Sequence, residues 1–202
     1  MNLNPSSGSA NQAFTIECSD LILREFGPDD LDDIHELTWQ PEIYEWLPGW
    51  NVPKEKRANW LLNYELKENR QFLKAVSDGG DVGQLCLRLG MIDKATGRFV
   101  GWCCTRIKPE LPPPNREIMY AVSRDYRSRG YSTQAAKGLT AFLFSSTNVD
   151  VLNAIALVHN VPSNKVIRKC GFAYHQNIEI DNQTYHAYKL TKTDWEKSVV
   201  GR

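Results

Sequence analysis

The order of its helix and strand patterns is the feature that most constrains how this chain can fold. From Thr15 onward, strand-like and helix-like segments follow one another in the order β-α-α-β-β-β-α-β-α-β-β. Segments of both kinds have apolar sides, which are buried together when helices pack onto one sheet. The order therefore predicts an α/β (α+β) fold with a single mixed sheet. The nearly all-apolar segment from Asn153 to Val158 is typical of a central strand.

The length of 202 residues predicts one domain. Residues 1–13 are small and polar and have little to bury. We therefore expect a disordered leader over residues 1–13 and a single domain over residues 14–202.

The charge balance excludes some classes of partner. Lys and Arg together number 24, and Asp and Glu together also number 24, so the net charge is zero. That balance argues against a broadly basic nucleic-acid-binding surface. No run approaches the roughly 18 apolar residues of a membrane span, and the N-terminus lacks the regions of a signal peptide. We expect a cytoplasmic protein, monomer or homodimer, with no nucleic-acid or membrane partner.

The five cysteines do not have the spacing of a metal site. There is no C-x-x-C pair and no Cys/His cluster with zinc spacing, so no metal is predicted. An odd number of cysteines without a signal peptide is typical of a reducing compartment. The adjacent Cys103 and Cys104 could act as a redox pair, but apolar neighbours favour buried core thiols.

The segment from Tyr120 to Thr133 carries the strongest chemical signal. A strand runs through a loop with Arg127, Arg129 and Gly130 into an amphipathic helix that starts near Ser132. Such a loop directs free backbone N–H groups to one point at the positive end of the helix dipole. This is either a pyrophosphate site or a solvated basic turn. Basic residues outnumber acidic ones from residue 116 to 137, which suits a small anionic cofactor better than a nucleic acid.

The aromatic stretch from Trp39 to Trp50 contains Tyr44 and Trp46 and is interrupted by prolines and a glycine. Rigid aromatic side chains on irregular backbone often line clefts. The stretch is either a wall of a substrate pocket or a packed helix-turn segment.

Three motifs together resemble one family. Residues 127–132 (RSRGYS) resemble the R/Q-x-x-G-x-G/A signature of the GNAT superfamily of N-acetyltransferases, with Ser132 where Gly or Ala is usual. Residues 160–172 are similar to that superfamily's N-x-x-S-x-x-V-x-x-K-x-G-F segment, and Leu21–Arg24 with Pro28–Asp30 is similar to its first strand and helix. The resemblance covers residues 15 to 195. It fits best the branch of ribosomal-protein N-terminal (alanine/serine) acetyltransferases.

The resemblance implies both a fold and a cosubstrate. It implies a mostly antiparallel mixed sheet with helices on both faces and a splayed parallel strand pair, formed by Glu117–Val122 and Asn153–Val158. Acetyl-CoA would lie in the splay, its pantetheine pairing with free strand groups and a backbone N–H near Ala121 or Val122 polarising the thioester carbonyl. The residues expected to bind it are Tyr120, Ala121, Val122, Arg127, Ser128, Arg129, Gly130, Tyr131, Ser132, Thr133, Asn160 and Asn164.

Two catalytic residues follow from the same resemblance. Glu117 would be the general base, acting through water, and its alternative role is a strand Glu paired with Arg116 or Arg106. Many relatives use a Tyr as the acid where this chain has Ile167. Ser163 is then the expected acid, and its alternative role is the N-cap of a short helix.

The expected function is acetyl transfer from acetyl-CoA to a primary amine by direct attack in a ternary complex, without a metal. The branch resemblance makes a protein N-terminus the first acceptor to consider. Amino acids, polyamines and antibiotic amines stay open as acceptors. A CoA-binding protein without transfer activity is the alternative from another class.

Overall fold

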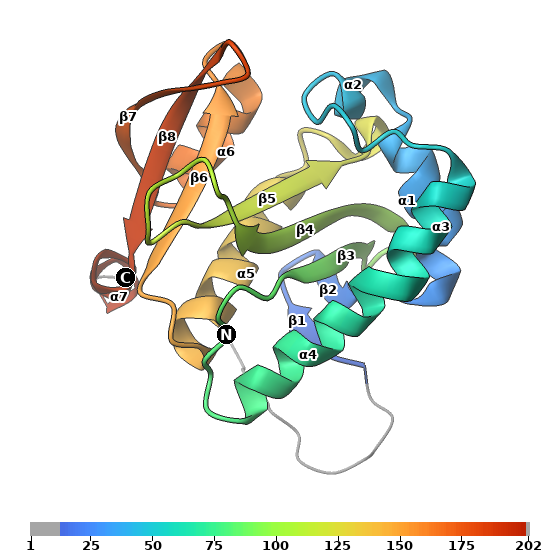
Figure 1. Ribbon diagram of the computed structural model, residues 1–202, viewed down its shortest axis with the longest axis horizontal. Coiled ribbons are helices and arrows are strands. Elements are labelled where there is room, and N and C mark those ends of the chain that lie inside the picture. The colour runs from blue at the N-terminus through green and yellow to red at the C-terminus, as the bar shows by residue number, and fades with distance from the viewer. Residues whose placement is uncertain (1–12, 201–202) are drawn as a thin grey trace.

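The computed structural model describes residues 13–200, which form one eight-stranded sheet (Figure 1). The strand order is β1-β2-β3-β4-β5-β6-β8-β7, and only β5 and β6 run parallel. The predicted fold class, a mixed and mostly antiparallel sheet, is confirmed. The strands are β1 (Thr15–Glu17), β2 (Leu21–Glu25), β3 (Leu87–Asp93), β4 (Phe99–Ile107), β5 (Arg116–Val122), β6 (Val151–Leu157), β7 (Ala173–Ile180) and β8 (Gln183–Thr191).

Helices cover both faces of the sheet (Figure 1). On one face lie α1 (Leu31–Thr38), α2 (Pro41–Tyr44), α3 (Lys54–Trp60) and α4 (Leu66–Ser77), with a π-helical turn (Leu61–Glu65) joining α3 to α4. On the other lie α5 (Tyr131–Ser146) and α6 (Val161–Lys169), which contact each other. The last helix, α7 (Lys192–Val200), follows β8 and packs Trp195 against Phe144 of α5.

The main core lies between α5 and the sheet. Ala135, Leu139 and Leu143 of α5 are fully buried against strand residues such as Leu21 and Leu23. A second cluster on the opposite face joins α1 and the π-helical turn to β4 and β5, through Ile34, Leu37, Leu61, Trp102 and Ala121. The middle strands of the sheet, β4 and β5, are therefore packed on both faces.

The helical segment that begins after Pro53 continues through the π-helical turn to Ser77. At one edge of the sheet, β1 and β2 form an antiparallel hairpin. In the expected leader, residues 1–12 lie outside the part that the structure describes.

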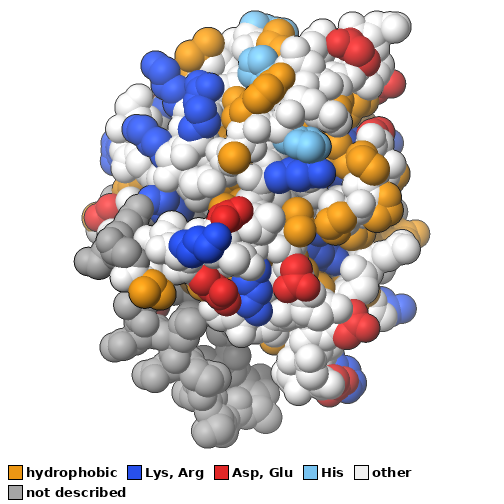
Figure 2. All heavy atoms as spheres, turned by 90° about the vertical axis from the view of Figure 1, so that its left-hand side faces the viewer, with side chains coloured by type: hydrophobic (Ala, Val, Ile, Leu, Met, Phe, Trp, Pro, Cys, Tyr) orange, Lys and Arg blue, Asp and Glu red, His pale blue; other side chains and the backbone are white. Residues whose placement is uncertain are grey.

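The side of the molecule formed by the β7–β8 hairpin has a mixed surface. Figure 2 shows acidic and basic side chains interspersed in its lower half, and histidines beside hydrophobic side chains in its upper half. Tyr174 of β7 and Val161 of α6 are among the exposed apolar residues of the chain. Among residues 13–200, no helix is long and apolar enough to cross a membrane.

The adjacent cysteines of β4 are core residues. Cys103 and Cys104 are buried and, as strand neighbours, belong to different core clusters on opposite faces of the sheet. Burial raises the pKa of the Cys104 thiol to about 12. A protonated, enclosed thiol is a poor nucleophile. The redox interpretation is therefore not supported.

Candidate active site

The central parallel strands separate almost as soon as they meet. β5 and β6 share one register pair, Glu117 with Asn153. The side chain of Asn153 holds the strands together there, because its Nδ2 donates to the carbonyl oxygens of Pro114 (2.9 Å) and Arg116 (3.1 Å). Beyond this point the facing edges of β5 and β6 have no register partner within the described residues. They present unpaired backbone groups that an extended ligand with amides can use.

The loop after β5 adds a cluster of free amides to this opening. Gly130 adopts φ 79° and is the N-cap of α5, and Ser128 also has a positive φ of 62°. Within the described part of the chain, the backbone N–H groups of residues 128–133 donate no hydrogen bond. Free amides at the positive end of a 16-residue helix form an anion-binding site.

The predicted loop residues contribute in different ways. Ser132 and Thr133 occupy the first turn of α5, so their amides belong to the free cluster. Tyr131 is buried and its hydroxyl donates to Asp93 Oδ1 at 2.7 Å. Its side chain therefore points into the protein, and only its amide is available. The side chains of Ala121 and Val122 are also buried, which leaves their backbone for a ligand.

The two loop arginines are held by backbone carbonyls. Arg127 Nη2 donates to the carbonyl oxygen of Glu42 at 2.6 Å. Arg129 Nη2 donates to the carbonyl oxygen of Asp125 at 3.3 Å, and its guanidinium lies over the ring of Tyr126. Neither makes an ion pair within the described residues. Both therefore carry charge that the protein itself does not neutralise.

The segment that contains α2 is tethered to this loop. The side chain of Gln40 donates to Ser123 Oγ at 3.1 Å and accepts the backbone N–H of Arg124 at 2.9 Å. With the bond from Arg127 to Glu42, three hydrogen bonds join the two segments.

Ser163 has a partner that the sequence analysis did not identify. The Tyr120 hydroxyl lies 3.1 Å from Ser163 Oγ and also donates to the Ser163 carbonyl oxygen at 3.2 Å. Burial raises the pKa of Tyr120, so its hydroxyl stays protonated at neutral pH. The tyrosine was expected to contribute only as part of the strand beside the cofactor. Its side chain instead links β5 to α6.

The asparagines of the second motif have roles inside the protein. Asn160 is the N-cap of α6, and its Oδ1 accepts the backbone N–H of Ser163 at 3.2 Å. The alternative role of Ser163 as the cap is therefore wrong. Asn164 is buried; its Nδ2 donates to the carbonyl oxygens of Leu157 and Asn160, and its Oδ1 accepts from Tyr188. This arrangement uses the polar groups of Asn164 for packing and does not favour its expected contact with a cofactor.

Glu117 lies at the point where the strands separate and faces the side covered by α1–α4. It is 1% exposed and accepts from Arg106 Nε at 2.7 Å, so the partner is Arg106 and not Arg116. Arg116 instead donates to the carbonyl oxygens of Leu85 and Gly83. Burial raises the pKa of the Glu117 carboxyl, and Arg106 opposes that shift. A carboxylate with a raised pKa is better suited to accept a proton.

A shallow cleft of about 360 Å³ lies on the same face as Glu117. It is lined by aromatic and charged side chains, among them Trp50, Trp60, Arg57, Glu65, Arg88 and Arg106. Trp50 also stacks on Trp102 with ring centroids 4.4 Å apart. Both interpretations of the aromatic stretch therefore hold for this residue: it packs and it lines a cleft. Trp46 lies against His159, which precedes the N-cap of α6.

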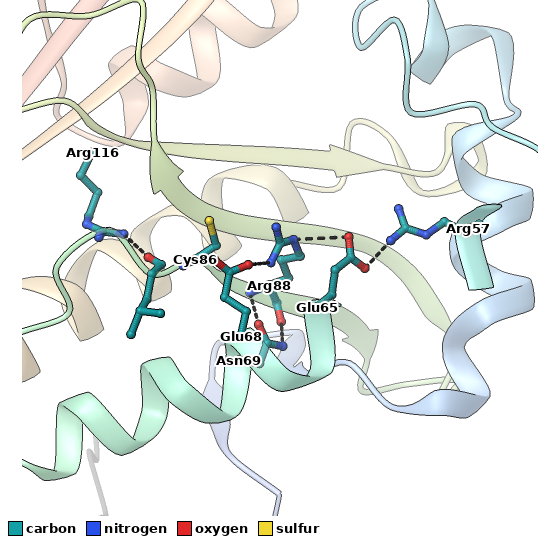
Figure 3. Close-up of polar contacts among 8 residues, drawn as sticks. Arg57, Glu65, Glu68, Asn69, Cys86, Arg88 and Arg116 are labelled. Atoms are coloured by element: carbon teal, nitrogen blue, oxygen red, sulfur yellow. Dashed lines mark hydrogen bonds and ion pairs between the residues drawn. The ribbon is translucent and has the colours of Figure 1, made fainter. Parts of the chain in front are cut away.

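Apart from Arg106, the charged side chains of this cleft were not predicted from the sequence. Arg57 and Glu65 form a buried ion pair, and Arg88 reaches Glu65 and Glu68 (Figure 3). An i,i+4 spacing would have been a recognisable signal for helix residues. Residues eight apart lie about 80° apart around a regular helix and more than two turns apart along it, so no pairing pattern in the sequence pointed to these two residues.

The family of this chain follows from its match to a protein-family model. The model of the acetyltransferase (GNAT) domain matches residues 20–173. The chain belongs to the GNAT acetyltransferase family. A curated relative, an uncharacterized N-acetyltransferase of Bacillus subtilis, is 23% identical over 151 residues, which cover 75% of this chain and 78% of the relative.

Solved GNAT structures have the same fold. A ribosomal-protein-S5-alanine acetyltransferase from Vibrio fischeri superposes with a TM-score of 0.69 at 15% identity, over 90% of this chain and 98% of that one. An aminoglycoside acetyltransferase in complex with coenzyme A and kanamycin superposes with a TM-score of 0.70 at 14% identity, over 89% and 99%. The residues described here include no cluster of His, Cys, Asp or Glu that could hold a metal ion.

Proposed function

We propose that this GNAT protein is an acetyl-CoA-dependent N-acetyltransferase that acts on a primary amine by direct attack in a ternary complex. The observation that carries the proposal is the parting of β5 and β6 beside the free amides of residues 128–133. One end of this opening suits an amide-containing chain and the other suits a pyrophosphate. Coenzyme A contains both groups.

The chain's own residues would hold the cosubstrate mainly through backbone. The amides of residues 128–133 would bind the pyrophosphate, and Arg127 and Arg129 would add charge. The free edge of β5 from Ile118 to Val122 would pair with the pantetheine amides. Acetyl-CoA supplies an acetyl group activated as a thioester.

Glu117 is the proposed base. An amine at neutral pH is mostly protonated and must lose a proton before it can attack. The carboxylate of Glu117 would take that proton, directly or through water, on the face of the sheet that carries the cleft. Its raised pKa increases its affinity for the proton. Arg106 would keep it ionised at neutral pH and hold it in place.

Ser163 and Tyr120 are the proposed acid. As the new C–N bond forms and the C–S bond breaks, the leaving thiolate needs a proton. Tyr120 lies on the strand face opposite to Glu117, because residues 117 and 120 differ by an odd number along β5. The paired hydroxyls of Ser163 and Tyr120 would deliver the proton from that side, so that acid and base do not neutralise each other.

The test is a thermal-shift titration followed by an amine screen. Acetyl-CoA is expected to raise the melting temperature, and at least one amine in a panel is expected to release free CoA thiol. A thermal shift without thiol release for any amine would instead support a CoA-binding protein without transfer activity. No thermal shift and no thiol release would contradict the proposal.

A further inference from the structure

We propose that the cleft beside Glu117 binds a carboxylate, so that the acceptor is an amine that carries a carboxylate group in the same molecule. This inference rests on the proposed function and specifies its acceptor. The carboxylate can belong to a free amino acid or to an acidic residue at a peptide N-terminus. Polycationic amines are disfavoured as acceptors.

Guanidinium groups outnumber carboxylates on the wall of the cleft. Arg57, Arg88 and Arg106 line it, against a single acidic residue, Glu65. The carboxylates that balance the other arginines lie elsewhere: Glu117 is buried behind Arg106, and Glu68 is not among the lining residues. A ligand in the cleft therefore meets guanidinium groups more than carboxylates.

These arginines retain hydrogen-bond donors that no residue of the described chain uses. Arg106 uses Nε for Glu117, and neither of its Nη atoms donates a hydrogen bond within the described residues. Arg88 uses Nη1 and Nε for Glu68 and Glu65, which leaves Nη2. Arg57 is 1% exposed, and its Nε is buried without a hydrogen-bond partner. Guanidinium groups with unused, partly desolvated N–H groups bind carboxylates strongly.

A π-helical turn brings the charges of Arg57 and Glu65 together. Residues eight apart on a regular helix point about 80° away from each other, because a turn takes 3.6 residues. The π-helical turn Leu61–Glu65 contains one extra residue. It therefore returns Glu65 to within about 20° of Arg57. The pair meets Arg88 of β3 across the helix–sheet interface (Figure 3).

Arg106 connects the cleft to the chemistry. It lines the cleft and its Nε holds the Glu117 carboxylate. A carboxylate on the free Nη atoms of Arg106 would share one guanidinium group with the Glu117 carboxylate. An amine in the same molecule would then be brought close to the base. Trp50 and Trp60 also line the cleft and would contact the apolar part of the acceptor.

The experiment begins with the wild-type protein and matched acceptors. L-phenylalanine is compared with L-phenylalaninamide, and the peptide amide Glu-Ala-Ala with Gln-Ala-Ala, with kanamycin as the cationic acceptor. Rates are expressed as kcat/KM per neutral amine, because amidation lowers the pKa of the amine. At least one acid is expected to exceed its neutral partner by about tenfold or more. The pair that shows the difference identifies the source of the carboxylate.

Variants assign the effect to the cleft. Arg106→Gln and Arg88→Gln are each expected to remove most of the preference for the acid, while the KM for acetyl-CoA stays unchanged. Arg106→Lys is expected to restore part of it. Arg98→Gln, an exposed arginine in the β3–β4 turn, is the matched control and is expected to keep the full preference. Melting curves show whether each variant is folded.

The outcomes separate this inference from the proposed function. If acetyl transfer occurs but acids and amides react equally, or kanamycin reacts best, the inference is wrong and the proposed function stands. If no amine is acetylated, the proposed function fails. The cleft is then judged by thermal shifts with N-acetyl-L-phenylalanine and its amide in the presence of CoA. Equal shifts, or an acid-specific shift that survives Arg106→Gln, would also overturn the inference.

Discussion

The two sides of the proposed site differ in the groups that would contact the ligand: main-chain groups on one side and side chains on the other. On the cosubstrate side, the groups that would contact the ligand are main-chain amides of residues 128–133 and the free edge of β5. On the acceptor side they are long charged and aromatic side chains from α3, the π-helical turn, β3 and β4. Main-chain groups depend on local backbone conformation and tolerate many side chains. Side-chain groups change with every substitution, so the acceptor side is where specificity can vary.

This difference predicts different effects of substitutions on the two sides. Substitutions on the cosubstrate side should act through backbone geometry and binding. Substitutions on the acceptor side and at the proposed acid and base should alter turnover and leave acetyl-CoA binding intact.

The largest effect is expected at Glu117. Glu117→Gln removes the base but keeps the size of the side chain, so kcat/KM should fall by about 10²- to 10³-fold. The thermal shift caused by acetyl-CoA should be unchanged. Glu196→Gln, at an exposed position of α7, is the matched control and should leave the rate within twofold. A Glu117→Gln enzyme with normal kcat/KM would exclude the base assignment.

Gly130→Asp tests the backbone side. It places a side chain at φ 79° and a negative charge beside the free amides, so acetyl-CoA should bind about 10- to 100-fold more weakly. Gly97→Asp separates strain from charge, since Gly97 has φ 69° and equally open surroundings in the β3–β4 turn. Calorimetric titration with acetyl-CoA measures the affinity of both variants. Equal loss of affinity in the two variants would show that the charge at the loop is irrelevant.

Ser163→Ala and Tyr120→Phe test the paired hydroxyls and should each lower kcat by about tenfold. Because both belong to one proton path, the double variant should be hardly slower than either single variant. Tyr174→Phe, which removes an exposed hydroxyl on β7, should have no effect. Fully additive losses would mean that the two hydroxyls act independently.

The smallest expected effect is a shift in the pH profile. Burial raises the pKa of Glu117, so the base should become protonated, and kcat/KM should fall, as the pH drops through a value above that of an ordinary Glu. Arg106 lowers this pKa, so Arg106→Gln should move the acidic limb to higher pH. A limb that does not move would assign it to another group.

The sequence predicted the main-chain half of the site better than the side-chain half. The loop around Gly130 and the Asn160 segment are local motifs, and local motifs fix local backbone. Arg57 and Glu65 meet across a π-helical turn that changes the helix phase, and no periodicity in the sequence indicates that turn. Likewise, the contact between Tyr120 and Ser163 joins residues 43 apart and depends on how α6 packs.

The single register pair between β5 and β6 also affects how the protein holds together. Between β5 and β6 the sheet divides into two blocks, β1–β5 and β6–β8–β7. The blocks are joined by the pair of Glu117 and Asn153, by the hydrogen bonds of the Asn153 side chain and by the helices packed on the sheet. A ligand that pairs with both open edges would supply backbone hydrogen bonds that the two strands do not make with each other. Its binding would raise the free energy of unfolding, and this increase would become larger with ligand concentration. The opening that we propose as the acetyl-CoA site is thus also the line along which the sheet has the fewest backbone pairs.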